Sequence, residues 1–145
     1  MKVKDTALII VDIQNDFCEG GKLEVPNADS IIPSVNNIQK EFNTIILTQD
    51  WHPKDHKSFA SQHKKKPFTQ IKMSYGNQIL WPDHCIQGTK GSEFHQDLNT
   101  RRANMIIRKG YRKNIDSYSA FFENDKKTST GLNGFLKDLC IKDIF

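Results

Sequence analysis

The stretch Ala7-Leu8-Ile9-Ile10-Val11-Asp12 decides the fold, because an uninterrupted apolar run of five residues ends there at a carboxylate. Such a run is typical of a strand that is buried on both faces of a sheet. Thr44-Ile45-Ile46-Leu47-Thr48 has the same character, Met105-Ile106-Ile107 is a third run, and Ile141 to Phe145 begins a fourth. The sequence therefore predicts four buried strands.

Helical patterns separate these runs. Asn27 or Asp29 could cap a helix that extends to about Phe42, and Ser129 or Thr130 could open a last helix through Leu139. Between Asp50 and Lys90 lies a polar stretch that is too long for an ordinary connection, so we expect it to carry function. Strands alternating with helices predict a single α/β domain, residues 1–145, with a mainly parallel sheet.

Composition limits the functional classes. The 145 residues are 37% hydrophobic and 26% charged, with a net charge of +4. The only dense basic run, His63 to Lys66, has no aromatic platform beside it, so we expect a solvated loop and no nucleic-acid partner. No apolar segment is long enough for a membrane span or a secretory signal. Three widely spaced cysteines argue against a disulfide scaffold, and we expect a cytoplasmic protein.

Three charged residues sit at or just beyond the ends of predicted strands: Asp12, Asp50 and Lys109. In parallel sheets, ligands bind outside the carboxyl ends of the strands. The pattern thus predicts two carboxylates and an ammonium at one rim. Asp12 could instead be a cap, and Lys109 a solvated strand end.

A metal site is predicted by the segment Asp50-Trp51-His52-Pro53-Lys54-Asp55-His56. Pro53 favours an extended conformation at His52, so the side chains of residues 50 and 52 face the same way. One carboxylate and three imidazoles suit Zn, Mn or Fe. The expected ligands of one divalent ion are Asp50, His52, His56 and His84. Asp55 and Cys85 are rival ligands that spacing does not exclude.

Four motifs in order along the chain resemble those of the nicotinamidase family, which belongs to the isochorismatase-like hydrolases. They are Val11 to Phe17, Asp50 to Pro53 with His56, Trp81 to Cys85, and Lys109-Gly110 with Tyr118 to Phe121. The resemblance implies a three-layer fold with helices on both faces of the sheet. It also implies hydrolysis of nicotinamide to nicotinate and ammonia in NAD salvage, and cleavage of pyrazinamide.

The same resemblance implies roles for individual positions. Asp12 matches the aspartate that takes the proton of a cysteine thiol, and Lys109 matches the lysine that completes the triad. The predicted metal ligands match those of the family, where the ion receives the pyridine nitrogen of the substrate. Residues that match the aromatic lining of the nicotinamide pocket are Phe17, Trp81 and Tyr118. Phe17 and Trp81 could equally be ordinary core aromatics. A homo-oligomer is compatible with the resemblance.

The attacking cysteine of the family has no counterpart here. It lies in a glycine-rich turn after the fourth strand, whereas none of Cys18, Cys85 and Cys140 fits that position. We therefore expect a domain truncated at its C-terminus, without its last strands and helices, and inactive alone. The alternatives are a non-catalytic remnant that binds metal or nicotinamide and needs a partner chain, and another hydrolase of the superfamily. His63 and His95 match no motif, and we expect them at the surface.

Overall fold

Four parallel strands in the order β5-β2-β1-β6 form the main sheet of the computed structural model, which describes residues 3–145. A separate antiparallel pair is formed by β3 and β4. The strands and α-helices are β1 (Val3–Ile10), α1 (Ile32–Ile38), β2 (Phe42–Asp50), β3 (Gln70–Met73), β4 (Gly76–Ile79), β5 (Met105–Lys109), α2 (Leu132–Asp138) and β6 (Asp143–Ile144). Short 3-10 turns lie at Asn15–Phe17, Ala28–Ile31, Gln39–Glu41, Ala60–His63 and Lys90–Ser92.

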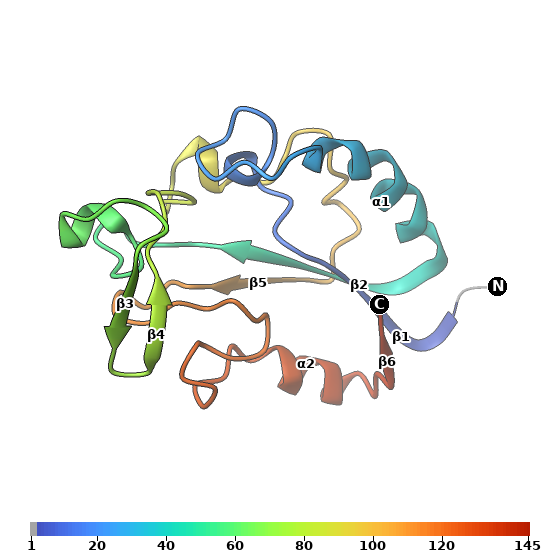
Figure 1. Cartoon of the computed structure of the whole chain (residues 1–145). Helices are drawn as coiled ribbons and strands as arrows, with labels where there is room; N and C mark the ends of the chain where they lie inside the picture. Colours follow the sequence, from blue (N-terminus) through green and yellow to red (C-terminus); the bar gives the residue numbers. More distant parts are fainter. Residues whose placement is uncertain (1–2) are drawn as a thin grey trace.

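The apolar runs of β1 and β2 form strands because they have packing partners on both faces of the sheet. The prediction of four buried strands is wrong for the other two: Ile106 of β5 is exposed, and both residues of β6 are exposed. Leu8, Ile45 and Leu47 point to a core shared with Ile32 of α1. On the opposite face, a second core is formed by Ala7, Ile46, Ile107, Leu132 and Leu136. Figure 1 shows α1 above the sheet and α2 below it. The α/β class, the parallel sheet and the helices on both faces are thus confirmed.

Helix boundaries differ from those predicted. The helix expected from Asn27 or Asp29 is interrupted: a 3-10 turn precedes α1, and another follows it before β2. Asn27 has a left-handed backbone (φ 63°) and makes no capping hydrogen bond. The Asp29 carboxylate accepts a hydrogen bond from Glu19 N instead of capping α1. The last helix begins at Leu132, after Gly131 with φ 99°.

The long polar segment after β2 contains the β3–β4 hairpin, which the sequence analysis did not predict. In it Gln70 pairs with Ile79 and Met73 pairs with Gly76. Figure 1 shows the hairpin on the side toward which the arrowheads of β2 and β5 point. The segment therefore covers the carboxyl ends of the strands, where a parallel sheet places its ligand site.

Within the described residues 3–145, no helix has both the length and the apolar composition needed to cross a membrane.

Candidate active site

The rim of the sheet is held together by Lys109. Asp50 and Lys109 are register partners at the ends of β2 and β5. Lys109 Nζ donates to Asp50 Oδ1, and it also lies 2.7 Å from Asp12 Oδ2. The side chains of Lys109, Asp50 and Asp12 are 4%, 9% and 15% exposed. The three strand-end charges thus form one contiguous group.

The two carboxylates of this group have different electrostatic properties. Burial alone would raise the pKa of Asp50, but Lys109, followed by the neighbouring His52 and His84, holds it well below its ordinary value. Burial also raises the pKa of Asp12, and there Lys109 offsets only part of the effect. For Lys109, burial would lower the pKa, but the two carboxylates outweigh it and raise that pKa. Lys109 is therefore a fixed ammonium, and Asp12 is the carboxylate that accepts a proton more readily.

Thr48 fixes the position of Asp12. Its hydroxyl donates to Asp12 Oδ1 (2.6 Å) and accepts from Asp12 N (3.1 Å). Asp12 has φ 48°, a left-handed conformation that a non-glycine residue adopts at a cost. Thr48 was not predicted as a site residue, because in the sequence it is one more residue of an ordinary buried strand.

Next to this group, Asp50, His52 and His84 could hold a metal ion, since they place one ligand atom each within 4.8 Å of one another. His52 Nε2 is 3.6 Å and His84 Nε2 is 3.7 Å from Asp50 Oδ2. The opposite nitrogens bond backbone oxygens: His52 Nδ1 is 2.8 Å from Gly110 O, and His84 Nδ1 is 2.8 Å from Pro82 O. With Nδ1 donating, each Nε2 presents a lone pair toward the shared centre, as metal-binding histidines do.

Gly110 makes room for His52. Its φ is +64°, and a β-carbon built there would overlap Cε1 of the His52 ring and lie 2.7 Å from its Nδ1. Only glycine combines this backbone with so close an approach. The motif Lys109-Gly110 therefore serves two purposes, because its lysine reaches the carboxylates and its glycine supports the imidazole.

His56, the fourth predicted ligand, does not join this group. The turn after Pro53 directs it toward Ser58 Oγ (2.7 Å from Nδ1) and Ile115 O (3.1 Å from Nε2). Burial, followed by the neighbouring His52, lowers the pKa of His56 to about 4. Another potential metal group does combine His52, His56 and Asp116, but it excludes Asp50 and His84. His56 nevertheless lies beside His52, with 4.4 Å between the ring centroids.

The two rival ligand candidates, Asp55 and Cys85, lie outside the potential metal site. Asp55 forms an exposed ion pair with Lys113. Cys85 is buried, and its Sγ lies 3.9 Å from Gly91 O. Neither belongs to a potential metal group among the described residues.

The three predicted aromatic residues line one cavity beside the metal group. Its volume is about 230 Å³. The lining consists of Phe17, Leu23, Asp50, Trp81, His84, Lys109, Asp116, Ser117 and Tyr118. Phe17 packs edge-on against His84 (5.6 Å between centroids), and Trp81 packs edge-on against Tyr118 (6.1 Å). Leu23, Asp116 and Ser117 were not predicted, since nothing in their local sequence marks them.

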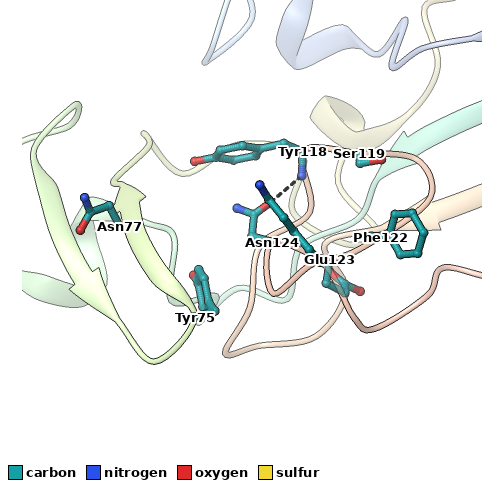
Figure 2. A pocket seen from close by; sticks show the side chains of 8 residues that line it. Tyr75, Asn77, Tyr118, Ser119, Phe122, Glu123 and Asn124 are labelled. Carbon is teal, nitrogen blue, oxygen red and sulfur yellow. Dashed lines mark hydrogen bonds between the residues drawn. The ribbon is translucent and has the colours of Figure 1, made fainter.

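An outer groove of about 620 Å³ shares Tyr118 with this cavity. Figure 2 shows Tyr118 beside Asn124 and across from Tyr75. The buried Gln78 forms hydrogen bonds with residues that line the cavity and with one that lines the outer groove. Its Nε2 donates to Asp116 Oδ2 (3.0 Å) and to Tyr118 Oη (2.9 Å), while its Oε1 accepts from Tyr75 Oη (2.9 Å).

No cysteine of the described residues lines the inner cavity. Cys18 is buried in the core on the α1 side of the sheet, and Cys140 is exposed just after α2. Burial, followed by the nearby carboxylates, raises the pKa of Cys85. None of the three is an activated thiol beside Asp12 and Lys109.

The fold and this rim define an isochorismatase-type hydrolase: residues 6–145 match the isochorismatase domain family, and the chain belongs to it. Within that family it belongs with the nicotinamidases. It is 52% identical to the nicotinamidase of Acinetobacter baylyi over 99% of this chain and 68% of that protein. A solved nicotinamidase/pyrazinamidase of Acinetobacter baumanii superposes with a TM-score of 0.97 at 52% identity, over 99% of this chain and 70% of that one.

Two more distant structures carry ligands. The pyrazinamidase of Pyrococcus horikoshii, solved in complex with zinc, has a TM-score of 0.74 at 35% identity, over 97% of this chain and 68% of that one. The yeast nicotinamidase bound to the inhibitor nicotinaldehyde has a TM-score of 0.88 at 30% identity, over 96% of this chain and 72% of that one.

Proposed function

We propose that this chain carries the metal- and amide-binding part of a nicotinamidase, which converts nicotinamide to nicotinate and ammonia in NAD salvage and also accepts pyrazinamide. One observation carries the proposal: a single cavity is bounded by Asp50 and His84, by Lys109 and by three aromatic side chains. Its volume of about 230 Å³ suits a one-ring amide. The free cysteines and the 26% of charged residues support a cytoplasmic location.

Asp50, His52 and His84 are the proposed ligands of one divalent metal ion. The donor set fits, because a carboxylate and two imidazoles whose Nε2 atoms converge suit Zn, Mn or Fe. When bound, the ion supplies a Lewis acid that holds the pyridine nitrogen. We assign His56 a supporting role, since both its ring nitrogens are already engaged.

Asp12 is the proposed proton acceptor, and Lys109 is the cation that stabilises negative charge near the reacting carbon. Asp12 must take the proton of the attacking thiol and return it to the departing ammonia, and water then hydrolyses the thioester. A raised pKa suits this exchange better than that of an ordinary surface aspartate. Lys109 lines the cavity and is held by both carboxylates, so its charge is present throughout.

The aromatic lining fixes the plane of the substrate ring. Phe17 packs against His84 of the potential metal site, and Trp81 packs against Tyr118 in the loop after β5, so these contacts hold the aromatic lining in place. Side chains that hold a ring in one orientation bring the carboxamide to the reacting groups at little entropic cost. The ring nitrogen then distinguishes pyridine amides from benzamide.

The attacking thiol is the component that the described residues do not supply to this cavity. Removing one member of a catalytic unit costs nearly as much as removing all of it. We therefore propose that this chain binds nicotinamide but does not turn it over at an enzymatic rate.

Ammonia release from nicotinamide tests this function. The samples are this chain, a fusion after Phe145 to the C-terminal part of the Acinetobacter baylyi nicotinamidase, and the Asp12→Asn and Lys109→Ala variants of the fusion. We expect ammonia release by the unsubstituted fusion and by none of the other three samples. Turnover by the purified chain that is lost on Cys18→Ala, Cys85→Ala or Cys140→Ala would show that the nucleophile is misplaced here.

A purely binding role is the second candidate, and it is favoured by the same lack of a thiol in the cavity. It predicts that the fusion also stays inactive although the chain binds metal and nicotinamide. The two candidates agree on binding and differ only in ammonia release by the fusion.

A further inference from the structure

A second group of potential metal ligands lies outside the active-site cavity. It consists of Cys18, Asp29 and His95, whose ligand atoms all lie within 4.8 Å of one another. These residues come from three separate segments: the turn after Phe17, the turn that precedes α1, and the loop before β5. His95 was predicted to be a surface residue, but its side chain is only 17% exposed and lies 3.1 Å (Nε2) from Asp29 Oδ1.

We propose that Cys18, Asp29 and His95 bind a thiophilic divalent cation of the zinc class. A thiolate, an imidazole and a carboxylate are a donor set that selects Zn and similar ions over Mg or Ca. Thiolate and carboxylate together neutralise the charge of such an ion. The Asp50–His52–His84 group contains no sulfur, so the two sites have different donor chemistry.

Neighbouring groups hold the ligands in place. Asp29 Oδ2 accepts from Glu19 N (2.8 Å), which leaves Oδ1 for His95. His95 N donates to Ile13 O (3.0 Å), which fixes that loop against the strand end. His95 Nδ1 accepts a hydrogen bond from Asp97 N (3.2 Å), which orients the ring with Nε2 toward Asp29. A hydrogen bond to the second ring nitrogen fixes the orientation of a metal-binding histidine.

The site is accessible to ions. A cavity of about 600 Å³ is lined by Cys18, His95 and three carboxylate residues, Asp16, Glu19 and Glu93. Cys18 itself is only 2% exposed, whereas the Asp29 side chain is 33% exposed. The buried sulfur thus forms the floor, and the open side leaves a position for water or a fourth ligand.

Cobalt(II) titration of the metal-free chain tests the proposal, because cobalt substitutes for zinc and a cobalt–thiolate bond gives a charge-transfer absorption band. We expect two equivalents of cobalt bound per chain and a charge-transfer band from one of them. Cys18→Ser should abolish the band and one equivalent. His52→Gln should remove the other equivalent and keep the band. No band in the wild-type chain, or a band that survives Cys18→Ser, would overturn the proposal.

Control variants separate ligand loss from misfolding. Cys85→Ser and Cys140→Ser remove the other two thiols and should retain the band. His95→Gln and Asp29→Asn change partly exposed side chains, so they provide a second test if Cys18→Ser does not fold. In folded protein, as judged by circular dichroism, both should weaken the affinity of the thiolate-containing site and leave the other equivalent unchanged. An unaltered band and affinity in both variants would contradict the assignment.

Discussion

The active-site cavity has two halves that are built differently. Asp50 and Lys109 stand at the ends of parallel strands, where the register of β2 and β5 sets their spacing, and Asp12 lies just beyond β1 within reach of Lys109. His84, Trp81 and Tyr118 come from irregular segments, and their positions depend on side-chain and backbone-oxygen contacts. The strand half is thus fixed by the sheet itself. The loop half is fixed by separate contacts of side chains with one another and with backbone oxygens.

This difference predicts how each half responds to mutation. A change in the strand half leaves buried charges unpaired, which affects folding as well as chemistry. A change in the loop half loosens the fit around the substrate and leaves the sheet intact.

Replacing Lys109 by Met should have the largest effect. Asp12 and Asp50 would then face each other without their shared cation, and loss of a buried partner costs about 3–5 kcal/mol. Lys142→Met is the matched control, since Lys142 pairs with Asp5 at the surface. Urea unfolding should show a large loss for Lys109→Met and no measurable change for Lys142→Met. Equal stability of the two variants would contradict the account of the rim.

Gly110→Ala should impair the metal group. The added β-carbon overlaps the His52 ring, and displacing an orienting partner of a metal ligand costs about 10- to 100-fold in affinity. Gly88→Ala is the control, because Gly88 also has a positive φ (+73°) but open space around its β-carbon position. Zinc affinity measured by chelator competition should fall only in Gly110→Ala. A similar fall in both variants would mean that backbone strain, rather than contact with His52, is responsible.

Thr48→Val should destabilise the chain by about 1–3 kcal/mol, because the isosteric change leaves two buried polar groups of Asp12 without their partner. Thr48→Ser keeps the hydroxyl and should restore most of the loss. In the fused enzyme, Thr48→Val should also lower kcat more than it raises KM, since Asp12 acts on the proton rather than on the bound ring. An unchanged kcat in a stably folded Thr48→Val fusion would remove Thr48 from the positioning of Asp12.

Tyr118→Phe should have the smallest effect. The hydroxyl accepts from Gln78 Nε2 (2.9 Å) and Trp81 Nε1 (3.3 Å), while the ring itself remains in place. Loss of these contacts at a half-exposed position is worth about 1 kcal/mol, or about fivefold in the Kd for nicotinamide. Tyr111→Phe, a change of the same atom outside the cavity lining, should leave binding unchanged in calorimetry.

The same division explains what could be predicted from the sequence. Apolar runs specify strands, and the rule that ligands gather at their carboxyl ends located Asp12, Asp50 and Lys109 before any comparison. His84 was predicted as a metal ligand from residue type. The aromatic residues followed only from family resemblance, since no local pattern specifies where a loop side chain points.

Three features of the structure were not predictable in this way. The direction of His56 depends on the turn after Pro53 and on contacts with Ser58 and Ile115. The β3–β4 hairpin is short and mostly polar, so its alternation was hidden in a polar segment. His95 meets Asp29 because of tertiary packing between distant segments.

Comparing the binding of nicotinamide with that of benzamide tests whether the cavity recognises the ring nitrogen through the Asp50–His52–His84 group. The measurement is calorimetric titration of both amides into the zinc-loaded fusion, in the Asp12→Asn background to prevent turnover. We predict at least tenfold tighter binding of nicotinamide, a preference that His84→Gln abolishes and His56→Gln retains. Equal affinity of the zinc-loaded Asp12→Asn fusion for the two amides would contradict recognition of the ring nitrogen by the metal site.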